Sequence, residues 1–401
     1  MINSKYNIVS QNIIFNTKTF AKLKLDEQHL EIFNNGFFDI FNDSEKKLLA
    51  DNGFLVESNE KELQEIITKL NDKEKNEMRL IIFPTMQCNF RCTYCYEDKI
   101  NINLDDEKYS KLIEIIDKFN GKFIYISWFG GEPSLKSSKI ISFLKLVKDK
   151  CIEKKISLQC GMTTNFYLID LNMLNNYVNS GIKYFQVTLD GLKMTHDKYR
   201  PLVDGSGTFD RVYDNLRQAL ISNLDFKIAL RLNYDNKTDY KDFFEMMIPF
   251  SKDKRFTFEI HPICNWDEKN RDYACNDFET KERKKEIQSL MNSLKIQIDN
   301  ESIFSKYMPC YACLKNNYIV DACGNIKKCT IHLNDKKNCL GKLNEFNTIN
   351  DDIWTRYKYE ECPNCEMFPL CLGKMCKYDN LDTFKKCRDK RVMEIEEEIR
   401  Y

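Results

Sequence analysis

Apolar segments alternate with amphipathic ones six times between residues 79 and 263, and few folds accommodate that pattern. The apolar segments have the length of strands and read RLIIFPT, FIYISWFG, ISLQCGMTT, YFQVTLDG, FKIALRLN and FTFEIHPI. The segments between them, such as DDEKYSKLIEIIDKFN, have the period of a helix. Strand followed by helix, repeated in this way, predicts a parallel sheet with right-handed crossovers. We therefore predict an α/β fold, a partial (β/α)6 barrel, with its chemistry at the carboxyl ends of the strands.

Three cysteines follow the first of these strands directly. Cys88, Cys92 and Cys95 occupy the stretch CNFRCTYC, and no fourth cysteine lies nearby in the chain. A closed zinc or iron–sulfur site has four protein ligands. Three thiolates therefore leave one coordination position open, which marks a reactive centre rather than a structural one. The structural alternative is a zinc knuckle completed by a distant histidine or cysteine.

Small and polar residues stand where the other strands end. The second strand closes with Gly130, Gly131 and Glu132 in WFGGEP, where the glycines would let the backbone approach a ligand closely. Polar or thiol side chains lie at or near the ends of the remaining strands: Asn165, Gln186, Thr188, Arg231 and Cys264. The alternatives are a plain turn for the two glycines, a buried thiol for Cys264 and ordinary strand-end capping for the other positions.

The charge balance argues against a nucleic-acid-binding or membrane-surface protein, because 61 basic residues match 61 acidic ones. The N-terminus MINSKYNIVSQ lacks the charged start and apolar run of a signal peptide, and no run reaches the roughly 18 apolar residues of a spanning helix. We therefore expect a soluble, cytoplasmic protein with no nucleic-acid or membrane partner. In that compartment the 17 cysteines indicate metal binding rather than disulfides, with the scattered Cys151 and Cys160 as buried core residues.

The three-cysteine loop resembles that of the radical S-adenosylmethionine (SAM) superfamily. The match is the spacing C-x3-C-x2-C after a first strand, with the aromatic Tyr94 just before the third cysteine. The resemblance implies a [4Fe–4S] cluster held by Cys88, Cys92 and Cys95, whose fourth iron is chelated by SAM. It also implies a 5′-deoxyadenosyl radical that abstracts hydrogen, and a Tyr94 ring that lies against the adenine.

Further motifs extend the resemblance over the whole predicted barrel. WFGGEP is similar to the superfamily motif that binds the methionine ammonium of SAM, and the later strand ends are similar to its contacts with the ribose and carboxylate. SAM-binding roles are thereby implied for Gly130, Gly131, Glu132, Asn165, Gln186, Thr188 and Arg231. The segment HDKYRPLVDGSGTFDRV resembles the subgroup that modifies proteins and peptides, although its His196 and Arg200 also fit a structural role.

The cysteine-rich C-terminal part resembles the SPASM extension of these enzymes, which carries two auxiliary [4Fe–4S] clusters. It contains the stretches CYACLKNNYIVDACGNIKKC and CPNCEMFPLC. The resemblance assigns one cluster to Cys310, Cys313, Cys329 and Cys376, and the other to Cys362, Cys365, Cys371 and Cys387. The spacing departs from the family pattern, so Cys323 or Cys339 could replace one of these ligands. Two zinc ribbons built from the same paired cysteines are the structural alternative.

Three consecutive domains are predicted. Residues 1–75 read as a small α+β module with a hairpin, NIIFNTKTFAKLKL, and short helices; residues 76–300 as the radical SAM partial barrel; and residues 301–401 as the SPASM domain. The first module is faintly similar to the winged-helix-like recognition element of peptide-maturing enzymes, which binds a leader peptide as an added strand. A plain barrel-capping domain is the alternative.

The resemblance favours an oxidoreductase that matures a ribosomally made precursor peptide by forming a thioether or carbon–carbon cross-link. Its expected partners are the precursor with its leader sequence and a flavodoxin or ferredoxin electron donor. A peptide epimerase, with Cys264 as hydrogen donor, is the first alternative. An anaerobic sulfatase-maturase-like oxidase is the second, but Thr330 stands where those enzymes place an Asp base. An iron–sulfur or zinc binding module without turnover is the non-enzyme alternative.

Overall fold

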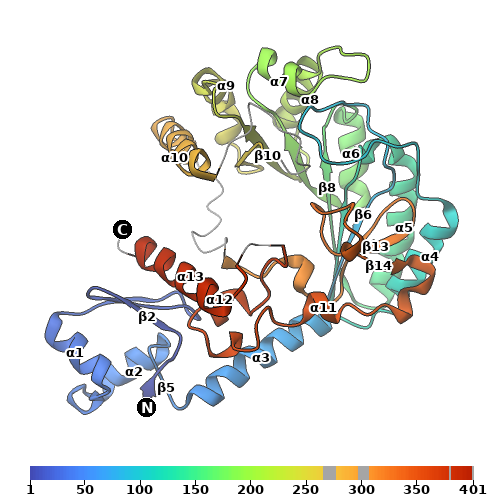
Figure 1. Ribbon diagram of the computed structural model, residues 1–401. Helices are drawn as coiled ribbons and strands as arrows, with labels where there is room; N and C mark the ends of the chain where they lie inside the picture. Colours follow the sequence, from blue (N-terminus) through green and yellow to red (C-terminus); the bar gives the residue numbers. More distant parts are fainter. Residues whose placement is uncertain (265–276, 297–306, 379–380, 400–401) are drawn as a thin grey trace. The chain divides into compact units, whose positions relative to one another are not determined.

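A computed structural model describes residues 1–264, 277–296, 307–378 and 381–399 (Figure 1). The chain forms two compact units. One consists of Glu77–Asn300 and Asn317–Ile349, and the other of Met1–Asn76, Glu301–Asn316 and Asn350–Tyr401. Cys275 and the predicted boundary at residue 300 lie outside the described residues, and the division into three consecutive domains stays a prediction.

The first unit contains the predicted parallel sheet. Its six strands are β6 (Glu77–Ile82), β7 (Phe123–Trp128), β8 (Ser157–Thr164), β9 (Ile182–Thr188), β10 (Lys227–Tyr234) and β11 (Phe256–Pro262). Each strand pairs in parallel with the next one along the chain. The sheet is therefore the partial barrel that the sequence predicted, and its strands match the six apolar segments.

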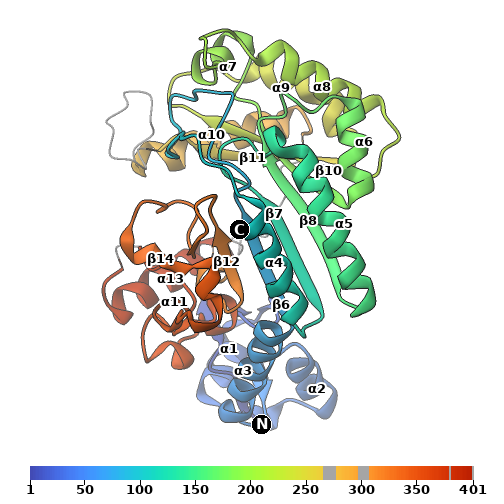
Figure 2. The same cartoon turned by 90° about the vertical axis from the view of Figure 1, so that its right-hand side faces the viewer.

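Helices connect the strands and cover the outer face of the sheet. They are α4 (Asp106–Lys118), α5 (Ser137–Glu153), α6 (Leu171–Ser180), α7 (Lys193–Tyr199), α8 (Phe209–Ile221), α9 (Lys241–Ser251) and α10 (Asp277–Ser293). Figure 2 shows α4 and α5 alongside the strands. Local residues fix several ends: Asp105 and Asp170 accept hydrogen bonds from the first turns of α4 and α6, and Gly181 ends α6 in the left-handed region.

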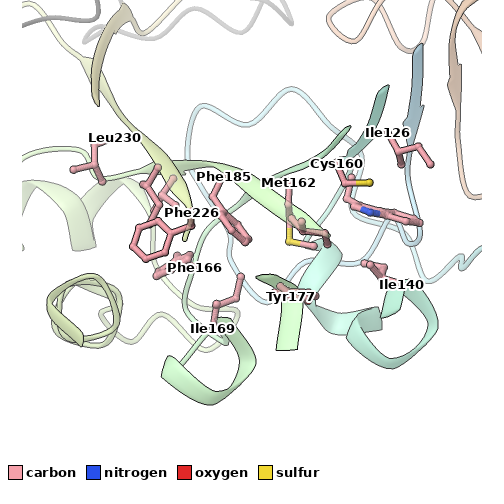
Figure 3. Close-up of a cluster of buried hydrophobic side chains, with 14 of the residues drawn as sticks. Ile126, Ile140, Cys160, Met162, Phe166, Ile169, Tyr177, Phe185, Phe226 and Leu230 are labelled. Carbon is pink, nitrogen blue, oxygen red and sulfur yellow. The ribbon is translucent and has the colours of Figure 1, made fainter. Parts of the chain in front are cut away.

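The core of this unit lies between the sheet and the helices (Figure 3). Alternate strand residues such as Ile126, Met162 and Phe185 point into it, where they meet helix residues such as Ile140 and Tyr177. Burial of each large apolar side chain contributes about 1.5–3 kcal/mol. The intervening strand residues face the other side of the sheet, which leaves that side for polar chemistry.

Two predicted core cysteines are confirmed, because Cys151 on α5 and Cys160 on β8 are both 2% exposed.

Part of the cysteine-rich segment also joins the sheet, which the sequence analysis did not anticipate. Its strands are β12 (Asn317–Val320), β13 (Asn325–Lys327) and β14 (Cys339–Lys342). β12 pairs in parallel with β6, while β13 and β14 continue in antiparallel. Strands of three or four residues are too short to show an alternating pattern.

The second unit begins with the predicted hairpin, extended to three antiparallel strands. These are β2 (Asn7–Ser10), β3 (Ile13–Asn16) and β4 (Lys22–Lys24), while β1 (Ile2–Asn3) pairs with β5 (Leu55–Val56). Its helices are α1 (Glu27–Asn35), α2 (Asp43–Asp51), α3 (Asn59–Asn76), α11 (Asp352–Thr355), α12 (Phe368–Cys371) and α13 (Phe384–Ile399). α13 packs against β2, with Ile395 in one apolar cluster with Ile8 and Phe15. No helix among the described residues is both long and apolar enough to span a membrane.

Candidate active site

The carboxyl ends of strands β6 to β11 surround a cavity of about 370 Å³. Every residue that the sequence analysis assigned to SAM or its cluster lines this cavity: Cys88, Cys92, Tyr94, Cys95, Gly130, Gly131, Glu132, Asn165, Gln186, Thr188 and Arg231. Cys264 and Thr330 line it as well. Parallel strands end at one edge of a sheet, which is why residues so far apart in the chain meet there. The individual role of each residue stays a prediction.

Backbone hydrogen bonds hold the cysteine loop against the segment that follows α7. Its amides at Arg91 and Thr93 donate to the carbonyls of Pro201 and Tyr199, at 2.8 and 2.9 Å. The amide of Val203 donates to the carbonyl of Asn89 at 3.1 Å. The segment that the sequence analysis linked to peptide-modifying enzymes is therefore the outer support of the cysteine loop.

The thiols of the loop lie in a partly desolvated setting. Burial raises the pKa of Cys88 to about 12 and the pKa of Cys92 to about 11. Neither thiol ionises by itself near neutral pH, so iron must displace the protons when it binds. Lys99 lines the cavity too, 3.5 Å from the Glu97 carboxylate. Burial alone would lower the pKa of Lys99, but Glu97 and the thiols of Cys95 and Cys88 raise it above its ordinary value.

Two glycines let the turn after β7 lie directly against the cysteine loop. A methyl group on Gly131 would stand 1.9 Å from the carbonyl oxygen of Gln87, the residue before Cys88. The amide of Glu132 donates to that same carbonyl at 2.8 Å. Gly130 adopts φ +97°, in the left-handed region that other residues rarely enter. The two glycines thus allow close packing of the turn against the cysteine loop, while the predicted close approach to a ligand stays a prediction.

The Glu132 carboxylate joins the ends of β7 and β8. It accepts hydrogen bonds from the Thr164 hydroxyl at 2.7 Å and from the backbone amides of Ser134 and Asn165, at 3.0 and 2.7 Å. The side chain is 1% exposed, so these three donors compensate most of the cost of burying its charge. The Asn165 amide nitrogen in turn donates to Asn89 at 2.8 Å, within the cysteine loop. Glu132 thus fixes the cavity wall as well as facing into the cavity.

A buried polar network holds the Tyr94 ring in place. Its hydroxyl donates to the Asp190 carboxylate and accepts from Arg200 Nη1 at 2.6 Å and from Asn233 Nδ2 at 3.1 Å. Asp190 is completely buried and also accepts from the Asn233 amide at 2.9 Å. Burial and the neighbouring Asp190 raise the pKa of Tyr94, against the effect of Arg200, so the phenol stays protonated.

The sequence analysis missed Asp190 and Asn233 as members of this site. Asp190 stands in the quoted stretch QVTLDG, and Asn233 lies two residues beyond Arg231 on the same strand, so both were within reach of the strand-end rule. His196, which it left open, is completely buried and accepts a hydrogen bond from the Asp190 amide at 3.1 Å. Arg200 lines the cavity, so it belongs to the site.

A second set of cysteines shares one small cavity in the other unit. Cys362, Cys365, Cys371 and Cys387, the four residues predicted for one auxiliary cluster, all line it, together with the basic side chains Lys358, Arg388 and Arg391. Four thiols in one mostly apolar cavity form a donor set that fits a [4Fe–4S] cluster. The neighbouring basic side chains would balance the negative charge of the thiolates.

The other predicted set divides between the two units. Cys310, Cys313 and Cys376 belong to the unit with α13, where the Cys313 thiol donates to the carbonyl of Met375 at 3.1 Å. Cys329, Cys323 and Cys339 belong to the barrel unit. No three His, Cys, Asp or Glu side chains in the described part of the chain lie close enough to share one metal ion. A [4Fe–4S] cluster makes a different demand, because each thiolate binds a separate iron.

The partial barrel and its three-thiol cavity define an iron–sulfur enzyme of the SAM-dependent class. Residues 82–247 match the family model described as the radical SAM superfamily. Residues 82–247 thus carry a radical SAM domain, as the cysteine loop predicted. SAM and [4Fe–4S] clusters are its cofactors, and the residues around the cavity fit them.

Curated relatives match different shares of the chain. A GTP 3′,8-cyclase of Campylobacter jejuni subsp. doylei is 31% identical over 40% of this chain and 47% of that protein. An Fe-coproporphyrin III synthase of Methanosarcina barkeri is 25% identical over 41% and 39%. The chain thus spans less than half the length of these two proteins. A cysteine-type anaerobic sulfatase-maturating enzyme of Clostridium novyi is 24% identical over 73% of this chain and 86% of that protein.

Two solved structures share the fold. The structure of anSMEcpe with bound AdoMet has a TM-score of 0.59 and 18% identity, over 81% of this chain and 97% of that one. Streptococcus suis SuiB bound to precursor peptide SuiA has a TM-score of 0.53 and 17% identity, over 92% and 94%. At such identity the likeness concerns the fold alone.

Proposed function

We propose that the chain matures a ribosomally made peptide by joining two of its residues through a thioether or carbon–carbon bond. The observation that carries this proposal is the composition of the barrel cavity, which combines the three thiols, the predicted SAM contacts and Thr330. When bound there, the cluster and SAM supply a 5′-deoxyadenosyl radical. Cross-linking is a two-electron oxidation: one hydrogen atom leaves the peptide for the radical, and a second hydrogen leaves as a proton and an electron.

The chain's own residues provide the frame for this reaction. The Tyr94 hydroxyl network and the Glu132 hydrogen bonds fix the cavity wall, so the peptide meets a preorganised site. Cys362, Cys365, Cys371 and Cys387 are the ligands that we propose for an auxiliary cluster, with one shared cavity in support, and such a cluster would supply an acceptor for the second electron. Cys310, Cys313, Cys329 and Cys376 are the proposed ligands of the other.

A peptide substrate is supported by the proteins of like fold. SuiB was solved with the precursor peptide SuiA, and anSMEcpe with the Kp18Cys peptide. Thr330 argues against the sulfatase-maturase reaction, because it lines the cavity where those enzymes use an Asp base. A hydroxyl cannot accept a proton near neutral pH.

Epimerisation is the second candidate, and Cys264 favours it. This partly buried cysteine lies in the cavity wall just beyond β11, where a thiol could return a hydrogen atom to the opposite face of the peptide. The two reactions change the mass of the peptide differently. A cross-link loses two hydrogens, whereas epimerisation in heavy water gains one deuterium without oxidation.

The test begins with anaerobic reconstitution, chemical reduction by dithionite and incubation with SAM. Formation of 5′-deoxyadenosine supports the enzyme, and its absence, together with bound zinc, would favour a binding module instead. The precursor peptide encoded by a short neighbouring reading frame is then added in heavy water and its mass measured. A loss of two hydrogens supports cross-linking. One added deuterium that disappears in Cys264→Ser would replace that proposal by epimerisation.

We further propose that the leader peptide adds as a strand beside β4. The opposite edge strand, β2, is covered by α13. On either side of β4, the amide of Leu25 donates to the carbonyl of Asn12 and the carbonyl of Ala21 accepts from the amide of Asn16, so both groups face β3. Alternation therefore turns the amide of Lys24 outward. Lys24→Pro removes that outward donor, so leader-peptide affinity should fall while Lys24→Ala retains it. Equal affinity of the two variants by fluorescence anisotropy would exclude this edge.

A further inference from the structure

A hollow on the outside of the barrel unit lies behind the cysteine loop. Its lining residues come from α7 and from the turn after β10: Met194, Thr195, Lys198, Tyr199, Asp235, Lys237 and Thr238. Figure 1 shows α7 next to the α8 and α9 helices, on the outside of the strands. The hollow is separate from the SAM cavity, and nothing in the proposed reaction uses it.

The wall between the hollow and the SAM cavity is thin. Tyr199 lines the hollow and Tyr94 lines the cavity, and their ring centroids are 6.4 Å apart in an edge-to-face contact. The carbonyl of Tyr199 also accepts the hydrogen bond from Thr93, one residue from Cys92 and two from Cys95. A protein seated in the hollow would therefore be separated from Tyr94, a residue of the cysteine loop, by the ring of Tyr199.

The exposed charges of the hollow are cationic. Lys198 and Lys237 are exposed, and the Lys198 ammonium lies 5.2 Å from the centroid of the Tyr199 ring. The carboxylate of Asp235 is 2% exposed, and both of its oxygens accept hydrogen bonds. Its donors are the Tyr199 hydroxyl at 2.6 Å, the Thr238 hydroxyl at 2.7 Å, and the amides of Lys237 and Thr238 at 2.9 and 2.6 Å. The carboxylate is thus turned inward.

Apolar surface adjoins these cations. Met194, which lines the hollow, is 89% exposed. The exposed carboxylate next to the hollow along the chain is Asp239, which follows Thr238. A mixed cationic and apolar surface of this kind suits a protein partner with a negatively charged face.

We propose that this hollow is the docking surface for the one-electron donor of the enzyme, a small acidic carrier protein of the flavodoxin or ferredoxin kind. The inference rests on the proposed function, since SAM cleavage consumes one electron from outside. In the proposed function SAM and peptide would fill the cavity on the inner side of the cysteine loop, which leaves the outer side for the donor. The carrier is oxidised by one electron and the cluster is reduced by one, with no proton transferred.

The test compares a protein donor with a small chemical reductant. Lys198→Glu/Lys237→Glu reverses both exposed cations, so we expect 5′-deoxyadenosine formation with limiting, photoreduced acidic flavodoxin to fall at least about tenfold, the lower end of electrostatic steering effects. The rate with dithionite, which needs no docking surface, should stay unchanged. Lys145→Glu/Lys148→Glu on α5 is the matched control, because both lysines are exposed and lie away from the hollow in the chain. It should leave both rates unchanged.

Salt provides a second measurement on the unmodified enzyme. The flavodoxin-driven rate should fall as ionic strength rises, and the charge-reversed variant should lose that dependence. Three results would each overturn the proposal. The rate of 5′-deoxyadenosine formation in Lys198→Glu/Lys237→Glu could fall equally with flavodoxin and with dithionite, or it could stay unchanged with flavodoxin. The third such result is an equal fall of the flavodoxin-driven rate in the α5 control. Failure of the unmodified enzyme to cleave SAM with dithionite would instead overturn the proposed function.

Discussion

Gly131→Ala is the substitution that most directly tests the contact between the turn after β7 and the cysteine loop. The added methyl group would stand 1.9 Å from the Gln87 carbonyl oxygen, whereas real contacts of this kind begin at 3.0 Å. Because both sides are backbone, relief requires a shift of about 1 Å next to Cys88, and a misplacement of about 1 Å lowers turnover about 10²-fold. Overpacking costs a further 1–3 kcal/mol, approximately, in the free energy of unfolding.

We therefore expect Gly131→Ala to cleave SAM about 10²-fold more slowly in the dithionite assay, and to bind less iron and SAM after reconstitution. Gly181→Ala is the control, because Gly181 has φ +106° but nothing within 4 Å of an added methyl group. It should lose about 1–2 kcal/mol of stability from backbone strain alone and keep its iron content and cleavage rate. Wild-type iron content, SAM affinity and cleavage in Gly131→Ala would refute the close-contact argument.

Three further outcomes follow from the polar groups of the site. Arg200→Gln removes the guanidinium that donates to the Tyr94 hydroxyl, so the affinity for SAM, measured by equilibrium dialysis, should fall about tenfold. Arg200→Lys should recover part of that affinity. An unchanged affinity in Arg200→Gln would contradict a positioning role for Arg200. Glu132→Gln replaces the carboxylate that accepts three hydrogen bonds by an amide, so the free energy of unfolding in urea should fall by about 2 kcal/mol. A decrease below about 0.5 kcal/mol would be inconsistent with the network. Burial and Arg200 lower the pKa of His196, so the folded state binds its proton less readily than the unfolded state. The contribution of neutral His196 to the free energy of unfolding is complete above pH 6.5, approximately the pKa of histidine in the unfolded chain. As the pH decreases further, the free energy of unfolding falls by up to about 1.4 kcal/mol per pH unit. His196→Gln should lack that extra slope in urea unfolding between pH 7.5 and 5, and identical slopes would disprove the assignment.

Much of the fold could be read from the chain because its signals are local. The strand segments, the helix caps at Asp105 and Asp170 and the spacing of the cysteine loop all lie within a few residues of one another. The strand-end rule then placed the residues predicted to contact SAM at one edge of the sheet, and these residues line one cavity there. The resemblance to the SPASM extension assigned the auxiliary cysteines, and four of them share a cavity, while their role as ligands stays a prediction.

Other features depend on partners that sequence order does not reveal. Strands β12 to β14 join the sheet through pairing with β6, more than 200 residues away in the chain. Whether Arg200 was structural or part of the site could not be decided from its motif, because its contact with Tyr94 crosses 106 positions.

The sequence by itself determined the class of fold and the kind of metal chemistry, because hydrophobic period and ligand spacing act over one element or one loop. Tertiary structure decided which polar groups support the site. Tyr94, Asp190, Arg200 and Asn233 come from four different segments, and burying any of them alone would be costly. Only the folded partial barrel brings their donors and acceptors together, and the same fold sets the thin wall between the inner cavity and the hollow behind Tyr199.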